Sequence, residues 1–90
     1  MTSDLYSRSP EKIILYGTSW CGNCRSSRRV FAQVGTPYED IDIDADERAE
    51  SFVKEINRGN RSVPTIVFPD GAIMVEPSDD ELAAKLKSLA

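Results

Sequence analysis

Two cysteines, Cys21 and Cys24, are the side chains of this sequence whose type and spacing most directly offer chemistry. The chain contains no histidine, so mechanisms that use an imidazole are excluded, and catalysis would have to use cysteines or carboxylates. Thiolates are nucleophiles and metal ligands, and cytosolic cysteines are normally kept reduced. A close cysteine pair in this chain therefore indicates redox or metal chemistry.

Cys21 is predicted to attack disulfides and Cys24 to resolve the product. The pair lies where an apolar segment ends and a helix begins, and the unpaired N–H groups and dipole there stabilise an anion at Cys21. Cys24, one helical turn further on, can attack a mixed disulfide at Cys21. Burial is expected to keep Cys24 protonated longer than Cys21. Three arginines would add positive charge, the first most strongly: Arg25, Arg28 and Arg29.

A metal site or a purely structural disulfide is the alternative explanation of the cysteine pair. Zinc normally takes four nitrogen or sulfur ligands, and two cysteines without histidine supply only two. Structural disulfides are uncommon in reducing compartments. The sequence therefore favours a redox pair without a bound metal.

Strand and helix patterns alternate around the cysteines. Four short segments are predicted to be strands: residues 13–16, 38–43, 64–68 and 72–75. Three segments are predicted to be helices: residues 25–34, residues up to about 57 after an N-cap at Asp44 or Asp46, and the last segment after Ser78, with Leu82, Leu86 and Leu89 facing inward. This order, β-α-β-α-β-β-α, predicts an α/β thioredoxin-like fold with a four-stranded mixed sheet flanked by helices.

The remaining sequence indicates the extent and surroundings of this domain. Residues 1–11 are polar without a repeating pattern, so they are predicted to be a flexible leader, and residues 12–90 a single domain. A net charge of -4 and a pI near 4.7 disfavour nucleic acid and anionic lipid as partners. We recognise neither an export signal nor an apolar run that could span a bilayer, and therefore expect a cytoplasmic protein without a membrane partner.

Two segments resemble the signature segments of glutaredoxins: Tyr-Gly-Thr-Ser-Trp-Cys-Gly-Asn-Cys at residues 16–24 and Gly-Asn-Arg-Ser-Val-Pro-Thr at residues 59–65. The resemblance extends over residues 12–89, and several motifs are closer to mycoredoxins, which use mycothiol. It implies an enzyme that reduces protein disulfides or mixed disulfides with a low-molecular-weight thiol. The reductant would be mycothiol or glutathione, with no tightly bound cofactor.

The resemblance also implies roles for residues outside the cysteine pair. Pro64 would follow a cis peptide bond beside the active cysteine, and the backbone of Val63 would pair with a bound thiol peptide as an added strand. Trp20 would line the site, and Arg61 would meet one carboxylate of a glutathione-like ligand.

The segment after Pro77 resembles the start of the last helix of the family. There, at Ser78, the amides of Asp79 and Asp80 would hold a second substrate carboxylate. An alternative is that these acids only match the positive end of the helix dipole. The aspartates of residues 40–44, which alternate with isoleucines, are predicted to lie on a solvated strand face and not in a cation site.

Three functions remain open at this point. The first is reduction of protein disulfides and mixed disulfides, by a monomer. The second is a dithiol electron donor that is itself reduced by thioredoxin reductase. The third is an iron-sulfur cluster carrier, in which Cys21 from two chains and two small thiols complete four ligands.

Overall fold

The computed structural model describes residues 6–89, and residues 1–5 and 90 lie outside the described part. Its helices and strands follow the predicted order: β1 (Ile14–Gly17), α1 (Gly22–Val34), β2 (Glu39–Asp42), α2 (Glu47–Ile56), β3 (Thr65–Val67), β4 (Ile73–Val75) and α3 (Asp79–Ser88). β2, β3 and β4 are shorter than predicted because residues at the ends of the predicted segments lie outside the paired ladder. β1 keeps its predicted length but is shifted by one residue, so that it ends at Gly17.

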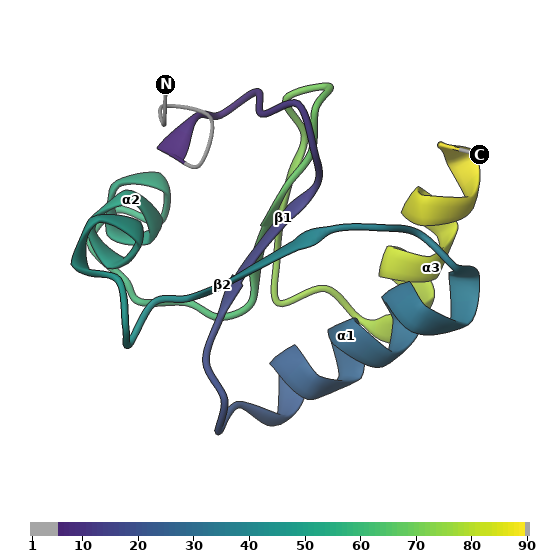
Figure 1. Cartoon of the computed structure of the whole chain (residues 1–90), viewed down its shortest axis with the longest axis horizontal. Coiled ribbons are helices and arrows are strands. Elements are labelled where there is room, and N and C mark those ends of the chain that lie inside the picture. The colour runs from purple at the N-terminus through teal and green to yellow at the C-terminus, as the bar shows by residue number, and fades with distance from the viewer. Residues whose placement is uncertain (1–5, 90) are drawn as a thin grey trace.

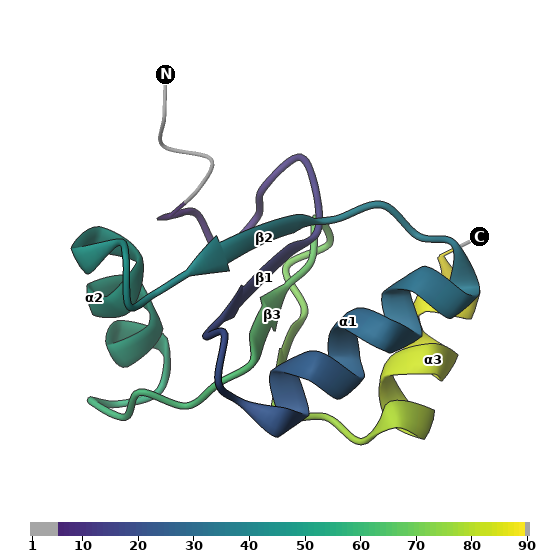
Figure 2. The same ribbon diagram turned by 60° about the horizontal axis from the view of Figure 1, so that its bottom comes forward.

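The four strands form one mixed sheet in the order β2-β1-β3-β4. β1 runs parallel to β2 and antiparallel to β3, and β3 and β4 form an antiparallel hairpin. Helices α1 and α3 lie side by side on one face of the sheet, and α2 covers the other (Figure 1, Figure 2). The predicted thioredoxin-like α/β fold is therefore confirmed.

Apolar side chains fill both faces of the sheet because β1 and β3 are buried throughout. The cluster beneath α1 and α3 contains mainly Leu15, Val30, Phe31, Ile66, Leu82 and Leu86. The cluster beneath α2 contains mainly Ile14, Tyr16, Ile43, Phe52, Val53 and Val67. The prediction that Leu89 faces inward is wrong: it is 45% exposed because α3 ends one residue earlier.

The start of each helix follows from its capping residue. α1 begins three residues before the predicted position because Cys21, with an extended backbone, acts as its N-cap and accepts the N–H of Cys24. Of the two predicted caps of α2, the structure uses Asp46, whose carboxylate accepts the N–H of Ala49 at 3.0 Å. α1 ends as predicted at Gly35, whose φ of 82° suits glycine.

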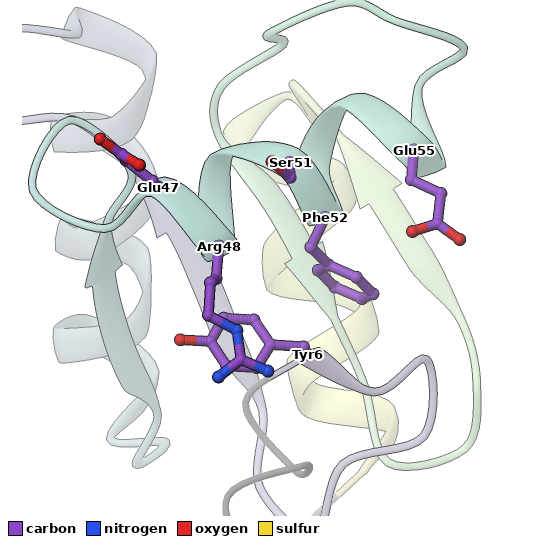
Figure 3. Close-up of a pocket in the computed structure, with 6 residues that line it drawn as sticks. All are labelled: Tyr6, Glu47, Arg48, Ser51, Phe52 and Glu55. Atoms are coloured by element: carbon purple, nitrogen blue, oxygen red, sulfur yellow. The ribbon is translucent and has the colours of Figure 1, made fainter.

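Tyr6, within the predicted leader, contacts α2. Tyr6 donates its hydroxyl to Asp46 at 3.0 Å, and the Arg48 guanidinium lies 4.6 Å from the centre of its ring. These contacts border a shallow, open pocket, also lined by Glu47, Ser51, Phe52 and Glu55 (Figure 3). Tyr6 thus packs against the domain, whereas the division of the chain at residue 12 stays a prediction.

Candidate active site

Cys21 lies at the junction of β1 and α1, where the backbone can bind an anion. Its Sγ accepts the N–H of Cys24 at 3.2 Å, and its thiol donates to the carbonyl oxygen of Val63 at 3.6 Å. The helix dipole places positive charge at this position. Only 9% of the Cys21 surface is exposed. The two contacts therefore fix the direction of the sulfur, and little of Cys21 is accessible to an approaching substrate.

Cys24 is fully buried on the first turn of α1. Burial, followed by the hydrogen bond with the Cys21 side chain, raises the pKa of its thiol to about 11. A backbone hydrogen bond from Thr18 and the charge of Arg28 oppose this rise only in part. Cys24 is therefore a neutral thiol at neutral pH, as the sequence predicted.

Arg28 is the arginine whose charge acts on Cys24, and the prediction that Arg25 would act most strongly is wrong for this thiol. Arg25 is exposed on α1. Arg28 lies one turn later and donates to Asp40 at 2.8 and 3.3 Å. This pairing raises the pKa of Arg28 and shares its charge with a carboxylate of β2.

Gly17 and Thr18 form the wall behind Cys24. A Cβ atom at Gly17 would lie 2.8 Å from Cys24 Sγ and 3.0 Å from a methyl group of Leu15, so only glycine leaves room for the buried thiol. Thr18 is also fully buried, and among the described residues its Oγ1 is a buried side-chain atom without a hydrogen-bond partner. Sequence reasoning assigned neither residue a part in the site.

The peptide bond between Val63 and Pro64 is cis, as the family resemblance implied. The carbonyl oxygen of Val63 faces Cys21, and that of Pro64 accepts the N–H of Glu76 at 2.9 Å. Glu76 has a φ of 48°, a region that favours glycine, and it occurs just before α3. The chain around Pro64 is therefore fixed between the cysteine segment and the start of α3.

Ser78 caps α3 through a reciprocal pair of hydrogen bonds with Glu81. The serine hydroxyl accepts the N–H of Glu81 at 3.1 Å, and the glutamate accepts the N–H of Ser78 at 2.9 Å. Asp79 and Asp80 follow on the exposed first turn, where backbone N–H groups have no acceptor within the helix. The polar groups of Ser78 are thus used by the cap.

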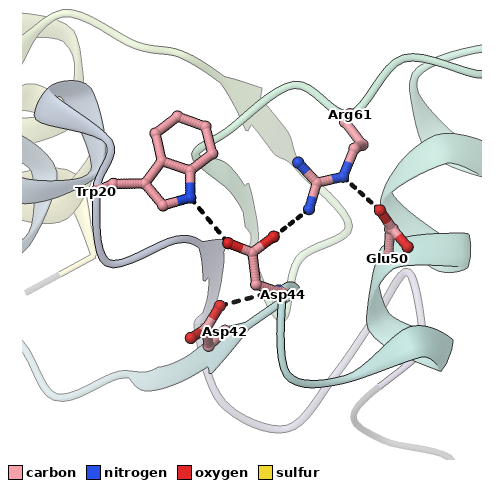
Figure 4. Close-up of polar contacts among 5 residues, drawn as sticks. All are labelled: Trp20, Asp42, Asp44, Glu50 and Arg61. Carbon is pink, nitrogen blue, oxygen red and sulfur yellow. Dashed lines mark hydrogen bonds and ion pairs between the residues drawn. The ribbon is translucent and has the colours of Figure 1, made fainter.

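A chain of hydrogen bonds connects Trp20 to Arg61 across the edge of the sheet (Figure 4). The indole N–H of Trp20 donates to Asp44 at 2.8 Å. Arg61 donates to the other oxygen of Asp44 and also to Glu50. The backbone N–H of Asp44 donates to Asp42 at 2.9 Å. The Trp20 bond, followed by that of Arg61, lowers the pKa of Asp44.

Asp44 is a residue that sequence reasoning placed on a solvated face and did not assign to the site. The feature that could have placed Asp44 at the site is the parallel pairing of β1 and β2, in which Gly17 lies opposite Asp42. Residues that follow two parallel strands meet at the same sheet edge, so Trp20 and Asp44 become neighbours. Arg61 forms ion pairs with two carboxylates of the chain, those of Asp44 and Glu50, and its contact with a ligand carboxylate stays a prediction.

Comparison of the sequence with known proteins identifies similarity to glutaredoxins and mycoredoxins. The family model described as glutaredoxin matches residues 13–73. Mycoredoxin 1 of Corynebacterium glutamicum is 41% identical over 78 residues, which cover 87% of this chain and 96% of that protein. A candidate glutaredoxin of Mycobacterium tuberculosis is 40% identical over 78 residues, which cover 87% of this chain and 93% of that protein.

Solved structures with the same fold have lower identity. A variant of the thioredoxin-like protein BC3987 is 24% identical and superposes with a TM-score of 0.69, covering 87% of this chain and 97% of that one. Wheat glutaredoxin is 20% identical and has a TM-score of 0.65, with coverage of 89% of this chain and 74% of that one. These similarities support the arrangement of helices and strands described above.

Proposed function

Because this chain belongs to the glutaredoxin family of thiol-disulfide oxidoreductases, we propose that it reduces mixed disulfides between proteins and a low-molecular-weight thiol. Cys21 is the attacking thiolate and Cys24 the resolving thiol. The observation that carries this assignment is the difference between the two sulfurs. Cys21 receives an N–H at a helix start, whereas Cys24 is buried and held neutral by its raised pKa.

In the first step the Cys21 thiolate attacks the small-thiol sulfur of the mixed disulfide. The old S–S bond breaks, the substrate protein leaves as a thiolate, and the small thiol becomes bonded to Cys21. A second small-thiol molecule then attacks its bound counterpart. This releases the oxidised small-thiol dimer and restores the Cys21 thiolate, so one reduced small-thiol molecule is consumed for each mixed disulfide that is reduced.

A second route uses Cys24. Its thiol loses a proton and attacks Cys21, which releases the small thiol and leaves a disulfide between the two cysteines. The hydrogen bond that joins the two side chains supports this short transfer. Two further small-thiol molecules, or thioredoxin reductase, would then return two electrons to the cysteine pair.

The binding surface proposed for the substrate surrounds Cys21. The exposed Trp20 directly precedes it in the chain, and the backbone of Val63, followed by Pro64, contacts its sulfur at 3.6 Å. The first-turn amides of Asp79 and Asp80, next to the cap at Ser78, would hold a polar group of the small thiol. We propose that the protein acts as a monomer in the cytoplasm, with mycothiol or glutathione as reductant; its likeness to a mycoredoxin supports mycothiol.

The test is the rate at which Cys24→Ser reduces a model peptide that carries either glutathione or mycothiol as a mixed disulfide. The two probes are used at equal concentration, each with its own thiol as reductant, and Cys21→Ser is the control. We expect turnover by Cys24→Ser with at least one probe and none by Cys21→Ser. Failure with both probes, together with turnover of the unaltered protein by thioredoxin reductase, would instead identify a dithiol electron donor.

A further inference from the structure

We propose that Asp44 is a positioning residue that holds the indole of Trp20 beside Cys21 and, together with Glu50, keeps Arg61 from binding a carboxylate of the small thiol. This inference rests on the proposed function, because it concerns how the same site selects its thiol. It assigns a role to a residue outside both signature segments. It also replaces the predicted role of Arg61 with a structural one.

The first argument is the exposure of Trp20. This side chain directly precedes Cys21 and is 62% exposed, so packing alone holds little of its ring. A free ring would sample several rotamers, and ordering it on binding would cost free energy. The bond of 2.8 Å to Asp44 removes that freedom before a substrate arrives. The ring therefore serves as a fixed wall of the site.

The second argument is that two contacts besides the Trp20 bond hold Asp44 in place. One carboxylate oxygen accepts from Trp20, the other accepts from Arg61, and the backbone N–H donates to Asp42 (Figure 4). Because the Asp44 carboxylate is fixed in this way, its hydrogen bond also fixes the orientation of the Trp20 indole. The anchor also connects the segment of Cys21 to the segment of Val63, because Arg61 lies two residues before Val63.

The third argument is the charge around Arg61. The Arg61 side chain is 33% exposed, and its guanidinium donates to Asp44, in the loop after β2, and to Glu50, in α2. One positive charge thus faces two negative charges, and the Nε and Nη2 groups of the guanidinium already donate to them. A carboxylate of a ligand at this wall would meet net negative charge. The wall consequently favours thiols without a carboxylate on this side.

Two substitutions of Asp44 separate the anchor from the charge. Asp44→Asn keeps an oxygen that can accept from the indole but removes the negative charge, whereas Asp44→Ala removes both. Glu47→Gln is the matched control, because it removes one carboxylate from the first turn of the same helix as Glu50. Circular dichroism of each variant establishes that it is folded.

The probes are one peptide in two forms, as a mixed disulfide with glutathione, which has two carboxylates, or with 2-mercaptoethanol, which has none. The readout is the second-order rate constant for release of the peptide thiol by the reduced protein. We expect Asp44→Asn to raise the ratio of the glutathione rate to the mercaptoethanol rate about fivefold. Asp44→Ala is expected to slow the mercaptoethanol probe about fivefold, and Glu47→Gln to leave both rates and their ratio unchanged.

A second readout does not depend on activity. Trp20 is the only tryptophan, so its fluorescence anisotropy reports the mobility of this ring. We expect the anisotropy to fall in Asp44→Ala and to stay near the unaltered value in Asp44→Asn. Trp20→Phe should slow the mercaptoethanol probe as Asp44→Ala does, and the double substitution should add little.

Three outcomes would overturn the inference. Unchanged anisotropy in Asp44→Ala would exclude the anchor, and additive effects of Trp20→Phe and Asp44→Ala would exclude their coupling. An unchanged probe ratio in Asp44→Asn would exclude selection by charge. If the unaltered protein releases neither peptide, the proposed function fails, and the anisotropy still decides whether Asp44 holds Trp20.

Discussion

Cys24 shows how one position determines the chemistry of a side chain. The thiol interacts with the backbone of Thr18 and the side chain of Cys21, and it occupies the space that a Cβ atom at Gly17 would need. The residue is fully buried, so water is excluded from the thiol. Burial disfavours the charged form, so the thiol stays protonated at neutral pH. This arrangement gives Cys24, the proposed resolving residue, a low reactivity toward solvent and a position next to Cys21.

The raised pKa of Cys24 predicts a pH dependence of stability for the reduced protein. The folded state holds the proton to about pH 11, whereas the unfolded thiol loses it near 9.0. The stabilisation is therefore complete below pH 9 and is lost as the pH rises toward 11, by roughly 2–3 kcal/mol. Urea unfolding of the reduced protein across this range measures the loss. Cys24→Ser should lack this component, and an identical decline in that variant would contradict the prediction.

Gly17→Ala is expected to destabilise the protein by roughly 1–3 kcal/mol. The added methyl group would lie 2.8 Å from Cys24 Sγ and 3.0 Å from Leu15, and both of these side chains are fully buried. Gly22→Ala is the matched control, because no atom lies within 4 Å of its Cβ position and alanine favours a helix. Denaturant midpoints of both variants provide the measurement. Equal midpoints would show that the side chains of Cys24 and Leu15 can shift to accommodate the added methyl group at little cost in stability.

Helices and strands contribute to the site mainly through their ends. The parallel pair β1 and β2 brings Trp20 and Asp44 to one edge, and the first turn of α1 brings the two cysteines together. The hydrogen bond from Glu76 to Pro64 connects the segment before β3 to the segment before α3. The active groups thus lie at the ends of rigid elements, where backbone groups are still available for ligands.

Cys21 is both the proposed nucleophile and the N-cap of α1, and substitutions can separate these roles. Serine keeps an acceptor for the N–H of Cys24, so Cys21→Ser should retain stability within about 0.5 kcal/mol while losing activity. Cys21→Ala should lose activity and also about 1 kcal/mol of stability. Thermal unfolding under reducing conditions compares the two. Equal stability of both variants would mean that the cap contributes nothing.

The molecule as a whole depends on a sheet that is covered on both faces. α1 and α3 cover one face and α2 the other, and Tyr6 extends the cover along α2. Within the described residues, no helix is long and apolar enough to cross a membrane. Ion pairs such as Lys85 with Asp70 lie on the surface, where each contributes little. The stability therefore comes mainly from the two apolar layers.

Tyr6→Ala is expected to lower stability by about 1–2 kcal/mol, because it removes the hydroxyl bond to Asp46, the stacking of Arg48 and apolar contact with α2. Arg8→Ala is the control, since Arg8 is exposed in the same segment. Chemical denaturation of both variants measures the difference. If the two variants are equally stable, the segment before residue 12 acts as the flexible leader that the sequence predicted.

The sequence alone determined the features that neighbouring residues encode. The period of the apolar residues predicted the strands and helices in their observed order, Gly35 marked the end of α1, and Ser78 with Glu81 predicted the cap of α3. The position of Cys24 on the first helical turn also predicted that it is the more deeply buried of the two thiols. These features are local, because they depend on backbone hydrogen bonds and side chains within one or two turns.

The tertiary structure alone decided the contacts between distant segments. Trp20 and Asp44 are 24 positions apart in the chain, and only the parallel pairing of β1 and β2 makes them partners. The same applies to the two carboxylates around Arg61. Helical spacing could not show that Arg28 and not Arg25 acts on Cys24, since this depends on how α1 lies across the sheet. Such contacts follow from the arrangement of whole elements, which no local pattern of residues specifies.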